Sequence, residues 1–390
     1  MIKNPLRVIC GASFIFSINL AFTAYVNSSF LEAYFTTRQV GILYAIGSIT
    51  LIFGLSKISI SLRRFGIYRT VIGLALINLL SLAVLSSANN SQALGIFFIT
   101  YLMTNGLIMF SLDELMTKYS ESRSAGRTRG IFLTAVNTAW LCSPFLAGWI
   151  IGQAGYGGIY WIALACSILL IILFYSRLRK YEDPEYHRFR LLDIFRILRT
   201  QKAVRRIYRA NLLLQFFFAT MVIYSPIYLR EYIGFSWDQI GIIFTCMLLP
   251  FVLFEIPLGR LADRIGEKRI MGAGFLIAAV ATGAIAFIHT PSVILWAVVL
   301  FCTRVGASAI EIMSDTYFFK HAVSAKDPGI IGVYRNTSPL AYIIAPLLAA
   351  LFISIFPYQY LFLALGILML SGIIYTATIE DPVPSPEHLQ

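Results

Sequence analysis

Twelve apolar runs, each roughly 16 to 24 residues long, divide this chain of 390 residues and limit its possible folds more than any other feature. A helix of about 20 residues crosses a hydrocarbon core of about 30 Å. With 58% hydrophobic and 13% charged residues, the chain has more apolar surface than a soluble domain can bury. We therefore expect an all-α membrane protein. The runs lie near Leu6–Tyr25, Gly41–Ile60, Thr70–Leu85, Leu94–Leu112, Ile131–Ile151, Ile159–Tyr175, Leu212–Leu229, Gln239–Pro257, Ile270–Ile288, Val293–Met313, Ile330–Ile353 and Tyr360–Thr376.

The first six runs and the second six are related by a repeat at an offset of 200 residues. The repeated residues fall in clusters, each at the same place relative to an apolar run: Gln39, Gly41 and Ile42 recur as Gln239, Gly241 and Ile242, Arg64, Gly66 and Arg69 as Arg264, Gly266 and Arg269, and Gly106 as Gly306. Many transporters are built from duplicated helices, with the substrate site between the halves. We expect six-helix domains at 1–176 and 210–380, a cytoplasmic linker at 177–209 and a disordered tail at 381–390.

The formal charge of +12 comes mostly from short connections between the runs, on one side of the predicted membrane. Connections on the other side contain only Arg38 and Arg230. This asymmetry is typical of a cytoplasmic membrane face and argues against nucleic acid as a partner. It predicts a multi-pass protein of the cell membrane, an inner membrane in a bacterium, with both termini in the cytoplasm. The first run is expected to be a retained helix because the seventh run repeats it.

Cysteine and histidine give no sign of a metal or a cofactor. The five cysteines lie inside apolar runs without a Cys-x-x-Cys pair, and the four histidines lie in predicted connections or the tail. Neither a disulfide framework, a zinc site nor a histidine proton relay within the membrane is indicated.

The linker contains HRFRLLDIFRILRT, in which Arg190, Asp193 and Arg196 alternate with apolar residues at helical spacing. The pattern predicts an amphipathic helix on the inner leaflet. The alternative is a solvated linker without fixed structure.

Between the eighth and ninth runs lies PLGRLADRIGEKR, residues Pro257–Arg269. Gly259 allows helices to approach closely, Asp263 can pair at the membrane edge, and Gly266 permits a tight reversal. The stretch closely resembles the G-x-x-x-D-R-x-G-R/K-K/R signature of the major facilitator superfamily. Together with the runs and the repeat, the resemblance covers nearly the whole chain. It implies the bacterial type of this fold, with twelve helices in two pseudo-symmetric domains, and a secondary transporter.

The first half departs from this signature, because SISLRRFGIYR has Ser59 and Arg63 in place of the glycine and the acid. The resemblance implies that Asp263 forms a conformational latch, with Arg129 as its partner, and that Arg264 pairs with Asp315 or Glu311. We expect pairing with loop arginines for the acids near the cytoplasmic ends of the fourth and tenth runs, and pairing or snorkelling for Arg335. Those acids are Asp113, Glu114, Glu311 and Asp315.

The fifth run contains AWLCSPFLAG, Ala139–Gly148, which is similar to a g-x-x-x-G-P-x-x-G-G element of many antiporters, and the eleventh run repeats it as AYIIAPLLAA, Ala341–Ala350. Pro144 and Pro346 each remove a helix hydrogen bond, and small neighbours allow close packing. The alternative interpretation is a kinked packing surface shared by importers and exporters.

Arg304 is the charge expected near mid-bilayer, where insertion costs about 2.5–3.5 kcal/mol. In the family the first, fourth, seventh and tenth helices line a central cavity, which makes Arg304 a candidate for substrate binding. The alternative is a structural pair or hydrogen bonds to helix carbonyls. Glu32, beyond the outer end of the first run, is expected to be solvated. The uncharged substrate-binding candidates on the cavity helices are Asn19, Asn105, Gln215 and Tyr224.

The sequence favours a proton-coupled secondary transporter that exports a small organic molecule by antiport. The alternative is an uptake symporter or exchanger for an organic anion. No mid-depth carboxylate identifies the residue that couples protons. An ATP-driven pump is disfavoured without a G-x-x-x-x-G-K-S/T loop, and a membrane enzyme without a motif such as H-E-x-x-H, so no enzyme is expected. A channel or a non-transporting sensor stays open. The expected partners are a small-molecule substrate, protons and the lipid bilayer, and the expected state is a monomer.

Overall fold

A computed structural model describes residues 5–87, 90–119, 125–178, 191–322, 334 and 336–379. Side chains are described for the same residues except 5–7, 117–119, 125–136, 191–195, 255, 256, 263 and 319–322. The described part is helical and contains no strand, which confirms the predicted fold class. The helices are α1 (Pro5–Ala24), α2 (Asn27–Glu32), α3 (Thr37–Ser87), α4 (Ser91–Tyr119), α5 (Ala125–Leu173), η1 (Phe174–Leu178), α6 (Leu191–Thr200), α7 (Lys202–Ile227), η2 (Tyr228–Tyr232), α8 (Trp237–Leu253), α9 (Glu255–Ile265), α10 (Glu267–Ala284), η3 (Ile285–Phe287), α11 (Val293–Ala322), α13 (Thr337–Ile353) and α14 (Tyr360–Ala377).

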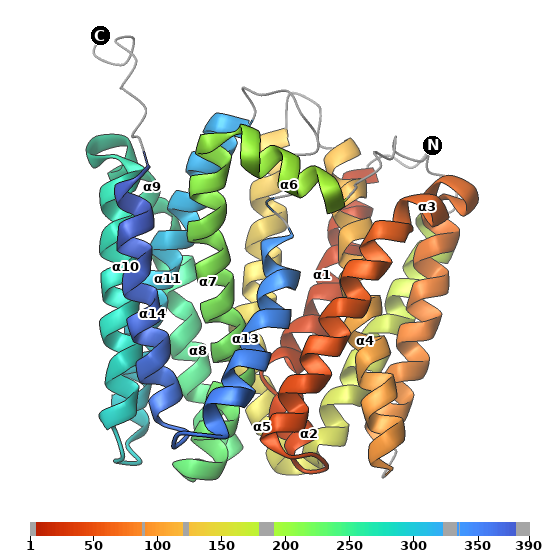
Figure 1. Cartoon of the computed structure of the whole chain (residues 1–390). Helices are drawn as coiled ribbons and strands as arrows, with labels where there is room; N and C mark the ends of the chain where they lie inside the picture. Colours follow the sequence, from red (N-terminus) through yellow and green to blue (C-terminus); the bar gives the residue numbers. More distant parts are fainter. Residues whose placement is uncertain are drawn as a thin grey trace. The chain divides into compact units, whose positions relative to one another are not determined.

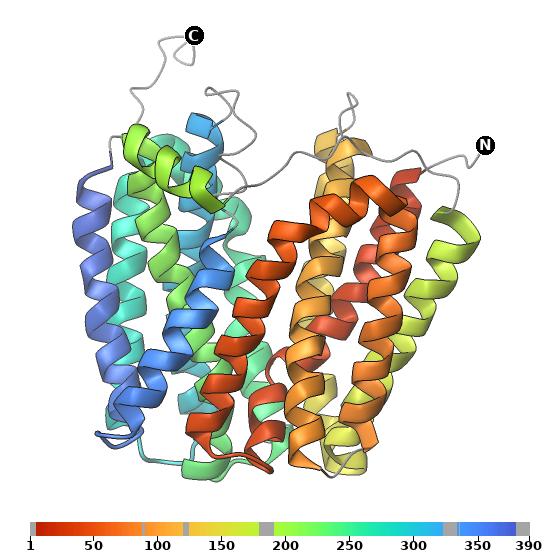
Figure 2. The ribbon, with the colours of Figure 1, turned by 45° about the vertical axis from the view of Figure 1, so that its right-hand side comes forward.

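Two of these helices each contain two of the predicted runs. α3 holds the second and third runs, and α5 holds the fifth and sixth, joined by non-helical backbone at Gly66 and Gly155. Figure 2 shows α3 turning back at its kink, so that its two arms lie side by side. Among the described residues, seven helices are long and apolar enough to cross a membrane, and three shorter apolar helices accompany them.

The repeat extends from sequence to backbone conformation at the reversals. Gly66 has φ 77° and ψ 163°, and Gly266, 200 residues later, has φ 85° and ψ 153°. Only glycine adopts such angles without steric strain. The residue predicted to permit a tight reversal does so in both halves. At Gly259, by contrast, an added Cβ would meet no described atom within 4 Å, so the expected close approach of helices is not found there.

The chain divides into two compact units. Unit 1 contains residues 1–190, 219–245 and 342–355, so parts of α7, α8 and α13 pack with the helices of the first half. In Figure 1 its first-half helices α1, α3, α4 and α5 run alongside one another. Their shared core includes Phe16 of α1, Leu62 and Val71 of α3, Leu112 of α4 and Leu170 of α5, all nearly inaccessible.

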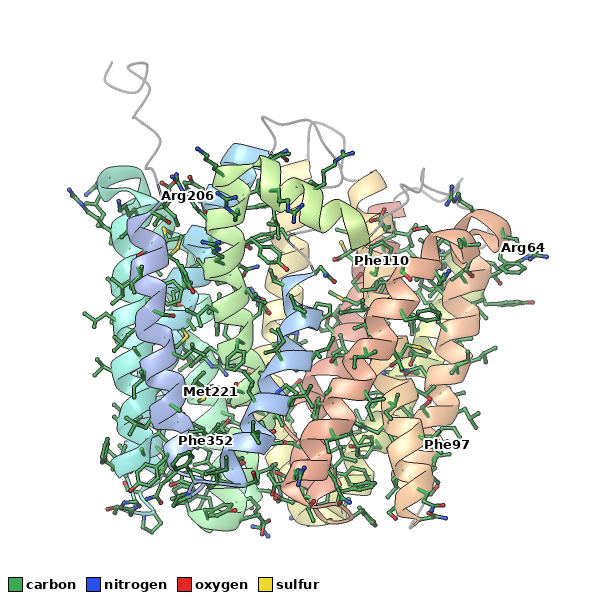
Figure 3. The ribbon with its side chains drawn as sticks, in the orientation of Figure 1. Arg64, Phe97, Phe110, Arg206, Met221 and Phe352 are labelled. Carbon is green, nitrogen blue, oxygen red and sulfur yellow. The ribbon has the colours of Figure 1, made fainter. Side chains whose placement is uncertain are left out.

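Charge and aromatic residues are distributed in unit 1 as expected for helices that cross a membrane. In Figure 3 the Arg64 side chain lies at the kinked end of α3 and points away from the helices, whereas Phe97 lies toward the opposite end of α4. Arg64 is exposed. Its charge therefore stays outside the apolar part of the unit, as the asymmetry of basic residues predicts.

Unit 2 contains residues 191–218, 246–341 and 356–390. α10 lies between α11 and α14 and buries Phe275 and Ala278 completely. At one end of this group the Lys268 ammonium donates to the carbonyl of Ala377 at 2.8 Å, which ties the first turn of α10 to the end of α14.

A helix, α6, covers Leu191–Thr200 inside the predicted linker. Ile197 is buried, and Nη1 of Arg205 at the start of α7 donates to the carbonyl of Leu198 at 3.3 Å. Its placement on a leaflet stays a prediction, as do the domain boundaries at 176 and 210. The tail at 381–390 lies outside the described residues.

Candidate functional site

Two of the predicted substrate-binding residues, Asn19 and Asn105, belong to one chain of hydrogen bonds inside unit 1. Asn19 on α1 is inaccessible, and its Nδ2 donates to Oγ of Ser167 at 2.9 Å and to the carbonyl of Ala163 at 3.3 Å. The hydroxyl of Tyr101 donates to Oδ1 of Asn19 at 3.2 Å. Both ends of the Asn19 amide are therefore satisfied within the protein.

The chain continues through Asn78 on α3. Oγ of Ser167 donates to Oδ1 of Asn78 at 3.1 Å. Nδ2 of Asn78 then donates to Oγ1 of Thr104 and to Oδ1 of Asn105, both at 2.9 Å. We call these residues the asparagine network, which joins α1, α3, α4 and α5: Asn19, Asn78, Tyr101, Thr104, Asn105 and Ser167. Sequence reasoning missed Asn78 and Ser167, although an asparagine and a serine inside apolar runs were visible signals.

Arg304 on α11 differs from the asparagine network, because some of its hydrogen-bond donors have no partner among the described residues. Its side chain is 1% exposed, and its Nε and Nη2 have no hydrogen-bond partner in the described structure. Its Cζ lies 5.2 Å from the ring centroid of Phe217 and 5.1 Å from that of Phe218, both on α7. Such cation–π contacts stabilise a guanidinium but use none of its N–H donors. Unit 2 thus buries a positive charge with donors left over for an acceptor.

The other predicted binding residues, Gln215 and Tyr224, are both on α7. Gln215 on α7 is half-buried. Tyr224 further along α7 belongs to unit 1, is inaccessible, and donates its hydroxyl to the carbonyl of Pro346 on α13 at 3.0 Å. Tyr224 therefore contacts the kink of α13 in this structure.

The repeated glycines and the kink prolines meet in unit 1. A Cβ at Gly41 of α3 would lie 3.0 Å from the carbonyl oxygen of Pro346 and 2.7 Å from the hydroxyl of Tyr224. A Cβ at Gly241 of α8 would lie 2.7 Å from the carbonyl oxygen of Pro144 on α5. Each repeat glycine thus packs against the kink proline of the other half. The repeat glycines and the helix prolines, which looked unrelated in the sequence, therefore form the same kind of helix crossing in two places: between α3 and α13, and between α8 and α5.

The predicted latch lies mostly outside the described side chains. Those of Asp263, Arg129 and Arg335 are not described, so the pairing of Asp263 with Arg129 stays a prediction. Arg264 is exposed, Asp113 and Glu311 are partly buried, and Oδ1 of Asp315 accepts a hydrogen bond from the hydroxyl of Tyr334 at 2.8 Å.

In the described part of the chain, no group of three or more His, Cys, Asp or Glu side chains has the arrangement of a metal site.

A family model described as the Major Facilitator Superfamily matches residues 8–238 and 210–389. The cis,cis-muconate transport protein of Acinetobacter baylyi is 21% identical over 255 residues, which cover 62% of this chain and 60% of that protein. The chain thus spans about three-fifths of this relative's length.

Two solved structures have similar folds. The nucleoside transporter NupG has a TM-score of 0.73 and 12% identity, covering 97% of this chain and 100% of that one. The POT family transporter PepTSo has a TM-score of 0.76 and 12% identity, covering 96% and 97%. Identities this low compare folds alone, and both likenesses support the predicted all-α membrane fold.

Proposed function

Since the chain belongs to the major facilitator superfamily, we propose that it is a secondary transporter of a small organic anion and that Arg304 binds the anionic group. A multi-pass membrane protein of this family moves its substrate by alternating access between two half-structures. The proposal concerns which solute is moved, and it rests on one observation: a buried arginine whose Nε and Nη2 have no partner among the described residues.

The argument from Arg304 is one of free energy. A guanidinium at membrane depth is tolerated beside water, a counter-charge or several acceptors. The phenyl rings of Phe217 and Phe218 supply none of these for Nε and Nη2. Because both nitrogens are N–H donors of one planar fork, a carboxylate would accept from them in the bidentate geometry that arginine favours. A substrate carboxylate would then be the missing counter-charge.

The printed name of the Acinetobacter relative supports the same class of substrate. Muconate is a dicarboxylate, and that protein is named as its transporter. We therefore propose a carboxylate with a small hydrocarbon body, whose apolar part would suit the rings of Phe217 and Phe218. Of the two transport modes left open by the sequence, this favours a symporter or exchanger for an organic anion over export of an organic molecule by antiport.

The antiporter-like element gives no direction to transport. One repeat glycine packs against Pro144 and the other packs against its counterpart Pro346, so the element serves as a packing surface in each half. That role is the alternative interpretation considered for Ala139–Gly148. Proton coupling remains part of the proposed function.

Binding to purified protein tests the assignment of Arg304. The probes are cis,cis-muconate, a series of other mono- and dicarboxylates, and the neutral dimethyl ester of muconate, each titrated by calorimetry. We expect Arg304→Gln to weaken carboxylate binding at least about tenfold, and Arg304→Lys to weaken it less, because lysine keeps the charge but loses the planar fork. The exposed Arg209 on α7 supplies a matched control, and Arg209→Gln should bind normally. Unchanged affinity in Arg304→Gln, or equal binding of the ester, contradicts the proposal.

The proposed orientation, with both termini in the cytoplasm, has its own test. Ser87 at the end of α3 is exposed, and Ser122 lies in the connection between α4 and α5. Cysteines placed at Ser87 and Ser122 should react with an impermeant maleimide from opposite sides, Ser87 from outside. Labelling of both from one side contradicts this topology.

A further inference from the structure

A cavity of about 320 Å³ lies where α2, α5 and η2 meet in unit 1. It is lined by Ser29, Glu32, Ala33, Tyr156, Glu231 and Tyr232. Glu32 comes from the first half of the chain and Glu231 from the second, so two carboxylates from different halves line one cavity. In Figure 1, α2 lies at the opposite end of unit 1 from the kink of α3.

Glu32 is less solvated than the sequence suggested. The residue is partly buried, its Oε1 accepts the hydroxyl of Thr37, and its Oε2 is buried without a hydrogen-bond partner in the described structure. Burial raises the pKa of the Glu32 carboxyl above its usual range, the bond from Thr37 lowers the pKa, and the negative charge of Glu231 raises it. A protonated Oε2 would remove the cost of burying an unpaired charge.

Other charged groups around the cavity do not neutralise this carboxyl directly. Nη1 of Arg230 donates to the carbonyl of Phe235 at 3.0 Å, and Asp238 lies beside α5, where a Cβ at Gly152 would be 3.4 Å from its Oδ1. The hydroxyl of Tyr160 donates to Oδ1 of Asn27 at 2.8 Å. The titratable and charged side chains near the α2 end on the described elements around it include Tyr34, Arg38, Tyr44, Tyr156, Tyr160, Tyr228, Arg230, Glu231, Tyr232 and Asp238.

We propose that Glu32 is a proton-binding site, and that it takes up a proton when the α2 end of unit 1 closes and releases it when that end opens. The carboxylates of Glu32 and Glu231 line one cavity and repel each other, and a proton on Glu32, the more buried of the two, removes that repulsion. When the end opens, water replaces the protein around Glu32, and the Glu32 carboxyl loses its proton.

The direction of the pH effect follows from linkage. The conformation in which the carboxyl holds its proton more tightly is the one that acid favours. Because enclosure raises the pKa of Glu32, closure of the α2 end should be favoured as pH falls and lost as pH rises through the raised pKa. In the predicted orientation this end faces away from the cytoplasm. Proton uptake from outside would then accompany closure toward that side. The proposal uses no substrate and does not depend on Arg304.

Infrared titration of the purified transporter, without substrate, tests proton binding directly. We expect a protonated carboxyl band that disappears as pH rises and is absent in Glu32→Gln. Glu231→Gln removes the like charge and should lower the midpoint of the Glu32 band, by less than loss of the enclosing side chains would, because burial is the larger cause of the raised pKa. Asp238→Asn is the control and should leave the midpoint unchanged, because Asp238 is exposed and does not line the cavity. A band that survives in Glu32→Gln, or an unmoved midpoint in Glu231→Gln, overturns the proposal.

Cysteine labelling tests the link to closure. In a cysteine-free background, Ala33→Cys reports on the cavity and Gln92→Cys reports on an exposed site elsewhere in unit 1. The rate ratio of the two sites removes the ordinary effect of pH on thiol reactivity. We expect this ratio to fall about tenfold on acidification, and to stay low at all pH values in Glu32→Gln. A ratio independent of pH in the protein with Glu32 intact overturns the gating role, whether or not Arg304 binds an anion.

Discussion

Thr104 and Arg304 occupy equivalent positions in the 200-residue repeat, yet their surroundings differ completely. Oγ1 of Thr104 accepts from Asn78 and donates to the carbonyl of Thr100, both at 2.9 Å, within the asparagine network. Arg304 is as deeply buried, and two of its nitrogens have no described partner. Burial alone therefore does not distinguish a structural polar residue from a functional one. The unfilled hydrogen-bonding capacity does, because proteins rarely leave buried donors unpaired without a reason.

From this difference we infer different roles for the two halves of the chain. The asparagine network holds α1, α3, α4 and α5 together through neutral bonds that are already made. In the proposed function, the unpaired donors of Arg304 in the second half bind the anionic group of the substrate. We therefore place anion recognition mainly in unit 2 and assign Asn19 and Asn105 a structural role, as part of the same proposal.

The largest effect on stability should come from removing the unpaired charge. Arg304→Met replaces it with a flexible apolar side chain, and we expect the free energy of unfolding to rise by about 2 kcal/mol while carboxylate binding is lost. Thermal unfolding in detergent measures the first and calorimetry the second. Clear destabilisation of Arg304→Met would instead mean that Arg304 has a structural partner.

A smaller effect of opposite sign is expected in the asparagine network. Asn78→Leu leaves Ser167, Thr104 and Asn105 without the partner that joins them, and should lower the free energy of unfolding by about 1–2 kcal/mol. Thr100→Val removes only a bond within α4, to the carbonyl of Ile96, and is the control, with little expected change. If Asn78→Leu unfolds at the same temperature as the parent protein, the network is not the structural element that the comparison requires.

The smallest effect is expected at Tyr224. Tyr224→Phe removes the hydroxyl bond to the carbonyl of Pro346 but keeps the ring, so the loss should be about 0.5–1.5 kcal/mol. Carboxylate affinity should stay within about twofold if Tyr224 supports the crossing of α3, α7 and α13 and does not bind substrate. Tyr360→Phe on α14 serves as the exposed control. A large loss of affinity in Tyr224→Phe would restore the hydroxyl to the substrate site.

Much of this architecture could be predicted from the sequence, because run length and reversal geometry are local properties. The apolar runs predicted α1, α4 and α14 closely, and the glycine at each reversal predicted where the backbone turns. Arg304 stood out because a charge far inside an apolar run has few explanations. Each of these inferences depends on residues that are near one another in the chain.

What could not be predicted depends on contacts between distant segments. Ser167 and Asn78 are 89 positions apart, and nothing in either run indicates that they share a bond. The meeting of Gly41 with Pro346 and of Gly241 with Pro144 also required the folded structure, although each residue had been noticed. Glu32 looked solvated because α5 and η2, which enclose it, are remote in sequence.

The paired backbone angles at Gly66 and Gly266 affect how the protein tolerates genetic variation. Every missense change at a glycine codon introduces a Cβ, and an L-residue held at such an angle strains the backbone whatever side chain it carries. A complete scan of single variants should mark both positions as intolerant, although they lie at chain reversals, within α3 and between α9 and α10. In such a scan, loss of function at these glycines would report a failed chain reversal, and intolerance to mutation would not by itself locate the substrate.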